Sequence, residues 1–96
     1  MSNDAELRKK IADGERASQL LNDPMIVSAL KEMRETVYEN IRSSHFRHKD
    51  EREYLYLQLR AIDEFEKRFT QRMKNGHVAA SRLDELKRTM KRAIGV

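Results

Sequence analysis

The chain has 96 residues, of which 39% are hydrophobic and 38% charged, so it is long enough for one small domain and too short for two. It contains no cysteine, which excludes disulfides, thiolate chemistry and zinc sites built on cysteine. No apolar run approaches the roughly 20 residues that a membrane-spanning helix needs, and none resembles the core of a signal peptide.

The charge is unevenly distributed along the chain. The formal net charge is +4, yet residues 67–96 carry 9 Lys and Arg against 2 Asp and Glu, a net of +7, whereas residues 1–66 carry a net of −3. A basic segment of this kind indicates attraction to a polyanion or to an acidic protein surface. A well-solvated helix surface with a basic bias explains the same asymmetry, and both interpretations stay open here.

Helix signals predict an all-α fold, a small bundle of about four helices built on a long antiparallel hairpin. The whole chain, residues 1–96, is expected to form a single helical domain. Its first helix flanks the hairpin within residues 1–22, where Leu7 and Ile11 mark an apolar face at helical spacing. Gly14 interrupts this helix at a cost of about 1 kcal/mol relative to alanine, so we expect this helix to be the least stable element or to depend on a partner.

Asp23-Pro24 marks the boundary between the first two helices. Proline disfavours helical geometry in the residue before it, while aspartate is a good N-cap and proline suits the first helical position. The second helix is predicted from Pro24 to about Ser44, with one continuous apolar stripe at spacings of three and four. This stripe consists of Ile26, Leu30, Met33, Val37 and Ile41.

A short basic connection over residues 45–49 separates the second helix from the third. Asp50 is the predicted cap of the third helix, and Glu53 completes a capping box. Because long helices joined by about five residues pack antiparallel, residues 24–75 are predicted to form the hairpin. Its expected core consists of Leu30, Met33, Val37, Leu55, Leu59 and Ile62.

Asn75-Gly76 predicts the end of the third helix in a left-handed cap. A basic C-terminal helix, residues 77–94, is then expected to fold back. Residues 54–59 are apolar nearly all round a helix, and although they alternate well enough for a strand, no second strand is present to pair with them. An all-round apolar turn is either buried between several helices or lies at an oligomer interface, and we expect Tyr54 and Leu57 in such a contact.

No catalytic, cofactor-binding or metal site is expected. His45 and His48 have the spacing of metal ligands, but no carboxylate stands at a matching spacing and the neighbouring Arg and Lys repel a cation. Asp63 and Glu66 share a helix face, where the nearby Lys67 favours a solvated ion pair over acid–base chemistry. The sequence has neither a glycine-rich phosphate loop nor a serine elbow. We therefore expect no enzyme, no cofactor and no small-molecule substrate.

The basic C-terminal cluster is the strongest functional lead in the sequence. Arg88, Lys91 and Arg92 are expected to point outward from the last helix, away from its apolar face, and Arg72 and Lys74 add charge near the end of the third helix. Such a cluster suits sequence-independent contact with phosphates, or an acidic protein surface. No helix-turn-helix signature of the usual length is present, so specific base readout is not expected.

A set of residues carries a resemblance to a known family: Arg16-Ala17, Leu20-Leu21, Asp23-Pro24, Glu51-Arg52, Tyr54-Leu55, Asn75-Gly76, Ala79 and Leu83. Over residues 14–88 the chain resembles a family of small helical proteins that tailed bacteriophages encode among genes for DNA packaging and head assembly. The resemblance implies a virion-assembly or packaging context, in the host cytoplasm or the virion rather than in a membrane or outside the cell. It transfers no catalytic residue.

We therefore expect a non-enzymatic bacteriophage virion-assembly or DNA-packaging protein that acts through helical oligomerisation and its basic C-terminal face. Its expected partners are further copies of itself, phage structural or packaging proteins, and DNA bound without sequence preference. Two alternatives are a small phage-encoded inhibitor or adaptor that binds a host protein, and a nucleic-acid-binding regulator. Self-association with salt-sensitive DNA binding favours the assembly or packaging function. Capture of one host protein favours the inhibitor or adaptor, and sequence-specific binding favours the regulator.

Overall fold

The structure is a computed structural model that describes residues 2–45 and 48–95. It contains three helices, α1 (Ser2–Leu21), α2 (Pro24–Ser43) and α3 (Lys49–Ala93), and no strand within the described residues. Helix makes up 92% of the described residues, which confirms the all-α prediction. The prediction of four helices is wrong, because α3 runs without a break through the segments assigned to the third and fourth helices.

The start of α2 confirms the prediction made from Asp23-Pro24. Asp23 is the N-cap, with an extended backbone at φ −68° and ψ 124°, and its Oδ1 accepts a hydrogen bond from the Met25 backbone N–H at 2.8 Å. Pro24 takes the first helical position. A backbone N–H at this position has no acceptor within the helix, so proline, which lacks the N–H, loses no hydrogen bond there. At the other end, the hydroxyl and the backbone N–H of Ser44 both donate to the Ile41 carbonyl, at 2.7 and 3.2 Å.

The start of α3 differs from its prediction. The helix begins at Lys49, so Asp50 lies inside the first turn and is not the N-cap. Asp50 and Glu51 still stabilise this turn, because carboxylates near a helix N-terminus interact favourably with the exposed N–H groups. The Arg52 side chain donates a hydrogen bond to the His45 carbonyl at 2.7 Å, which ties the first turn of α3 to the segment that follows α2.

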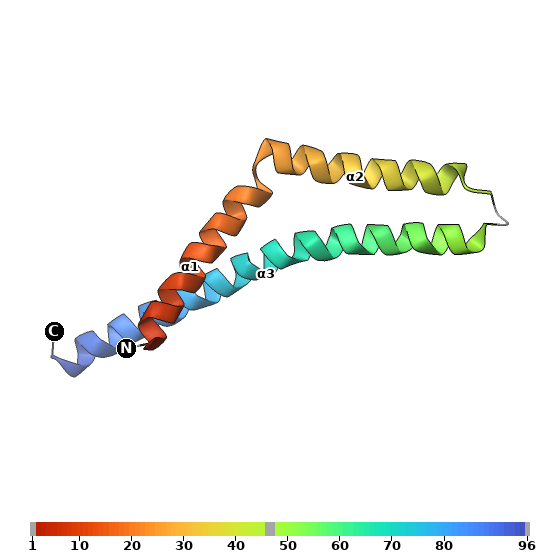
Figure 1. The fold of residues 1–96 in the computed structure, drawn as a ribbon. Coiled ribbons are helices and arrows are strands. Elements are labelled where there is room, and N and C mark those ends of the chain that lie inside the picture. The colour runs from red at the N-terminus through yellow and green to blue at the C-terminus, as the bar shows by residue number, and fades with distance from the viewer. Residues whose placement is uncertain (1, 46–47, 96) are drawn as a thin grey trace. The chain divides into compact units, whose positions relative to one another are not determined.

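The described residues pack as two units that share α3. In the α2 unit, residues 20–68, α2 packs on the first half of α3. In the α1 unit, residues 2–19 and 69–95, α1 packs on the second half of α3. Figure 1 shows α2 in orange and yellow beside the green half of α3, and α1 in red beside the blue half.

The core of the α2 unit is close to the predicted one. Leu30, Val37, Leu55 and Ile62 are buried together, and Ile26, Ile41 and Leu59 pack partly buried against them. The prediction that Met33 belongs to this core is wrong, because Met33 is 52% exposed. Helical geometry explains the difference, since Met33 lies beside the line through Leu30 and Val37 and not on it.

The predicted left-handed cap at Asn75-Gly76 is also wrong, because α3 continues through both residues. Gly95, at φ 72°, is the only described residue with a positive φ, so Gly76 keeps a negative φ within the helix. The Gln71 side-chain amide donates a hydrogen bond to Asn75 Oδ1 at 3.0 Å, which bridges one turn of helix at this point. The helix ends at Ala93 instead, two residues before the left-handed Gly95.

The continuity of α3 is explained by a close contact between the backbones of α1 and α3. A Cβ on Gly14 would lie 2.9 Å from the Arg72 carbonyl oxygen and 3.0 Å from the Gly76 Cα, and a Cβ on Gly76 would lie 3.1 Å from the Gly14 Cα. Ala17 and Ala79, about one turn away along each helix, are each 2% exposed. The two glycines thus allow an approach that a side chain would block, and packing on α1 overrides the local stop signal.

We predict that Gly14→Ala lowers the melting temperature, although alanine is ordinarily better than glycine in a helix by about 1 kcal/mol. The added methyl group meets the backbone of α3, and overpacking of this kind costs about 1–3 kcal/mol. Ser81→Ala, at an exposed position of α3, is the control and should leave the melting temperature unchanged or slightly raised. Circular dichroism during thermal unfolding measures the melting temperatures. A Gly14→Ala protein whose melting temperature equals or exceeds that of the wild type would contradict the close contact between the two backbones.

Ile62→Ala is expected to lower the free energy of unfolding by about 2–5 kcal/mol, because truncating a buried aliphatic side chain loses transfer free energy and leaves a cavity. Val27→Ala removes an aliphatic side chain from a half-exposed position of α2 and should change stability by no more than about 0.5 kcal/mol. Urea unfolding measures both. Equal losses for the two variants would show that the core has been assigned to the wrong face.

Candidate functional site

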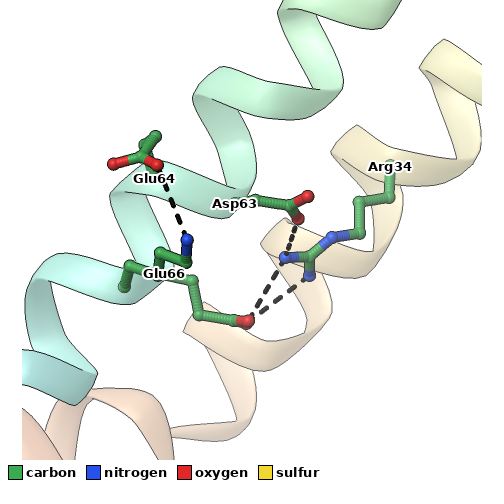
Figure 2. Close-up of polar contacts among 5 residues, drawn as sticks. Arg34, Asp63, Glu64 and Glu66 are labelled. Carbon is green, nitrogen blue, oxygen red and sulfur yellow. Dashed lines mark hydrogen bonds and ion pairs between the residues drawn. The ribbon is translucent and has the colours of Figure 1, made fainter.

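A charged cluster joins α2 to α3 in the α2 unit. Arg34 Nη2 lies 3.0 Å from Asp63 Oδ1 and 3.3 Å from Glu66 Oε1, and Arg34 Nη1 donates to Glu66 Oε2 at 3.5 Å (Figure 2). The Arg34 side chain is 25% exposed, less than either carboxylate. The hydrogen bond to Asp63 raises the pKa of Arg34, burial opposes this rise, and Glu66 adds to it. The cluster therefore links α2 to α3 through one cation and two carboxylates.

The predicted pairing of these carboxylates with Lys67 is wrong. Lys67 Nζ lies 3.8 Å from Glu64 Oε1, so it pairs with a neighbour on its own helix, while Asp63 and Glu66 bind a cation from α2 (Figure 2). Two acids three residues apart beside an apolar stripe are placed to face a neighbouring helix. The spacing indicates a contact with another helix, but it does not identify Arg34 as the partner.

An apolar groove runs along the other side of the α2 unit. At 3.6 residues per turn, Met33 and Arg34 flank the buried line through Leu30 and Val37 on opposite sides. The groove lies over the buried Leu30, Val37 and Ile62, and its exposed or half-buried lining consists of Ala29, Glu32, Met33 and Thr36 from α2 and Gln58, Ala61 and Phe65 from α3. Met33 and Phe65 are both 52% exposed. One side of the α2 unit is therefore charged and the other is largely apolar.

The two residues predicted to contact another copy continue this groove along α3. Tyr54, Leu57, Ala61 and Phe65 follow one another at spacings of three and four, so they share a helix face. Tyr54 is 61% exposed and Leu57 59% exposed, whereas Leu55 between them is buried. The apolar turn at the start of α3 thus has one face in the core and another at the surface. The contact between copies itself stays a prediction.

The five cations predicted to contact an anion all lie exposed on the part of α3 that belongs to the α1 unit: Arg72, Lys74, Arg88, Lys91 and Arg92. They fall into two groups, because the helix does not fold back after Gly76. Lys74 and Arg88 are 14 residues apart on one helix, which separates them by about 21 Å along its axis. A single patch of all five is therefore not formed along this helix, and the C-terminal group stands by itself.

Within the C-terminal group, the cations are arranged around an apolar stripe. Arg88 and Arg92 lie on the side of α3 opposite Leu83, and Lys91 lies beside the stripe. Among the described residues, none of these three cations makes an ion pair. Lys91 and Arg92 stand in the last turn, where cations also stabilise the helix C-terminus by about 0.3–1 kcal/mol.

His45 and His48 lie between α2 and α3. Their ring centroids are 5.7 Å apart, and His48 Nδ1 lies 3.2 Å from Glu51 Oε2. Across residues 2–45 and 48–95, no three or more His, Asp and Glu side chains are grouped so that they could hold a metal ion. Over the same residues, no helix combines the length and the apolar character needed to cross a membrane.

The described part of the chain thus presents the charged cluster, the apolar groove and the C-terminal cations as its candidate functional surfaces. No family model, curated protein or solved structure matches this chain. The functional argument therefore depends on these surfaces and on the chemistry of partners that fit them.

A double-mutant cycle tests the charged cluster. Arg34→Met and Asp63→Asn, alone and combined, should give a coupling free energy of about 0.2–1 kcal/mol, because Asp63 is mostly exposed and solvent screens the pair. The coupling should shrink in about 1 M salt, where the Debye length falls to about 3 Å. Glu64→Gln removes the carboxylate that Lys67 binds and should show no coupling to Arg34→Met. A coupling that is insensitive to salt would contradict an electrostatic origin.

Proposed function

We propose that this chain is a non-enzymatic assembly protein that acts in bacteriophage virion assembly or DNA packaging. In this function the α2 unit, an antiparallel helical hairpin, pairs with a second copy through its apolar groove. The basic end of α3 contacts DNA or another phage protein. One observation carries the proposal: seven hydrophobic residues are buried among the described residues, while twelve large hydrophobic ones are exposed. Such a surface is typical of a protein that binds another macromolecule.

The groove offers enough apolar surface for self-association. Tyr54 and Phe65 are both more than half exposed, and fully covered aromatic side chains bury about 150–250 Å² each. With Leu57 and Met33, they offer on the order of several hundred Å² of apolar surface per copy, against the roughly 800 Å² per partner of a standard interface. The groove is therefore the centre of an interface, which polar residues around it would complete.

A second copy suits this groove because two helices alone make only one layer. Domains bury their apolar faces between packed layers, and two hairpins placed face to face give the four-helix arrangement that meets this need. A two-fold symmetric pair uses the same patch on both copies. The Arg34 cluster on the other side of the α2 unit would remain in contact with solvent.

The phage context is supported by the resemblance carried by Arg16-Ala17 to Leu83. The contact with an anionic partner is supported by the net charge of +7 over residues 67–96. Every cation of the C-terminal group is exposed, so all of them are available to phosphates or carboxylates.

Sedimentation velocity of the purified chain tests the proposal. The wild type is expected to sediment as a dimer or larger oligomer at tens of micromolar protein, and Phe65→Glu to sediment as a monomer with its helix content unchanged. Tyr56→Glu is the matched control, because Tyr56 is an aromatic residue of α3 with similar exposure that does not line the groove. It should sediment like the wild type.

A wild-type protein that is monomeric at about 100 µM, where a dimer with a dissociation constant of a few micromolar would be mostly assembled, would contradict self-association. If such a monomer bound a single host protein through Phe65, the inhibitor or adaptor alternative would replace the proposed function.

A further inference from the structure

The apolar stripe on the second half of α3 continues beyond its cover. Leu83 is buried, but Leu86 is 40% exposed, Met90 67% and Ile94 72%. These residues follow at spacings of three, four and four, so they share one helix face. The face that α1 covers around Leu83 is therefore the same face that lies open two turns later.

The first turns of α1 are the part of this helix that lies beside Leu86. α1 begins at Ser2, and its first turns line a shallow pocket with α3 through Asn3 and Leu7 on one side and Val78 and Leu86 on the other. Past Leu86, the described residues place nothing on the stripe, as the exposures of the last turns show. The interface between α1 and α3 thus stops near Leu86, while the apolar row on α3 continues to Ile94.

The charges around the open stripe have one sign. Glu85 is the last acidic residue in the sequence, and Lys87, Arg88, Lys91 and Arg92 follow it. Helical geometry places Lys87 and Lys91 along one edge of the stripe, where they would face charges on whatever covers it. The occupant must therefore offer both apolar and acidic groups.

We propose that the last turns of α3 together with Ile94, residues 86–94, bind an acidic amphipathic helix of a protein partner. This rests on the proposed function, since it names the partner class of the basic end. A second copy of the same end is disfavoured because Lys87 and Lys91 would meet cations of equal sign. A phosphate backbone would engage the cations and leave Leu86, Met90 and Ile94 in water.

The shape of the stripe also favours a helix over a lipid surface. Leu86, Met90 and Ile94 form a row about 12 Å long and one residue wide, which has the width of a helix–helix seam. Helices that lie in a membrane surface present broader apolar faces, often with Trp or Phe, whereas this row is one residue wide and no Trp or Phe follows Phe69 in this chain. The partner helix continues the seam that α1 begins.

Binding of a synthetic probe to the full chain tests the inference. The probe is a fluorescently labelled helical peptide of about 18 residues, five turns long, with one leucine row flanked by glutamates. Its binding should weaken as salt rises. The same peptide with lysine in place of glutamate, and one of equal composition with the leucine row scrambled, should not bind.

The variant Met90→Gln with Ile94→Gln removes the row and keeps every charge, so it should bind the acidic probe at least about tenfold more weakly than the wild type. Both positions are exposed, so helix content and melting temperature should not change. Thr89→Gln, next to Met90 in sequence and off the row, is the matched control and should bind like the wild type.

The inference is overturned if the double variant binds the probe as tightly as the wild type, or if the wild type leaves the probe unbound at about 1 mM, the weak limit of specific recognition. Duplex DNA and vesicles containing phosphatidylserine are run in parallel. Tight binding of either one, without binding of the peptide, would assign the surface to a nucleic acid or to a membrane. Self-association through Phe65 is measured separately by sedimentation, so either result leaves that test intact.

Discussion

The backbone contact between Gly14 and Gly76 is the constraint on which the α1 unit depends. Each glycine lies where a Cβ would meet backbone atoms of the other helix, at 2.9–3.1 Å. Glycine ordinarily weakens a helix interior, so its presence in the middle of both α1 and α3 is understood only through this crossing. The contact also keeps α3 in one piece, because Gly76 stays helical where α1 packs against it.

The sequence predicted the structure correctly where interactions between neighbouring residues in the chain determine it. The N-cap at Asp23-Pro24 was predictable because the carboxylate, the proline ring and the first turn are all neighbours in sequence. At Asn75-Gly76 the local signal favoured a stop, and a contact between residues 62 positions apart reversed it. The prediction that Met33 is buried was wrong for a related reason. Spacings of three and four identify an apolar stripe, but they do not say which edge of the stripe the neighbouring helix covers.

The candidate surfaces were predictable to different degrees. The sequence indicated the exposure of Arg88, Lys91 and Arg92, although Lys91 lies beside the apolar row and only Arg88 and Arg92 lie opposite it. The pairing of Arg34 with Asp63 and Glu66 depends on the register between α2 and α3, which no local pattern in either helix specifies. The exposure of the apolar stripe at Met90 depends on where α1 lies along α3. Only the packed structure determines this position.

The sharing of α3 by both units affects how the protein folds. Starting a helix is unfavourable because several residues are fixed for the first hydrogen bond, while each added residue then gains one bond. A separate helix in each unit would need two such starts, whereas α3 needs one. Once either α1 or α2 has stabilised its part of α3, the helix can lengthen by one hydrogen bond per added residue into the other part. A change that destabilises one unit would therefore also destabilise the other, because both units contain part of one cooperative helix.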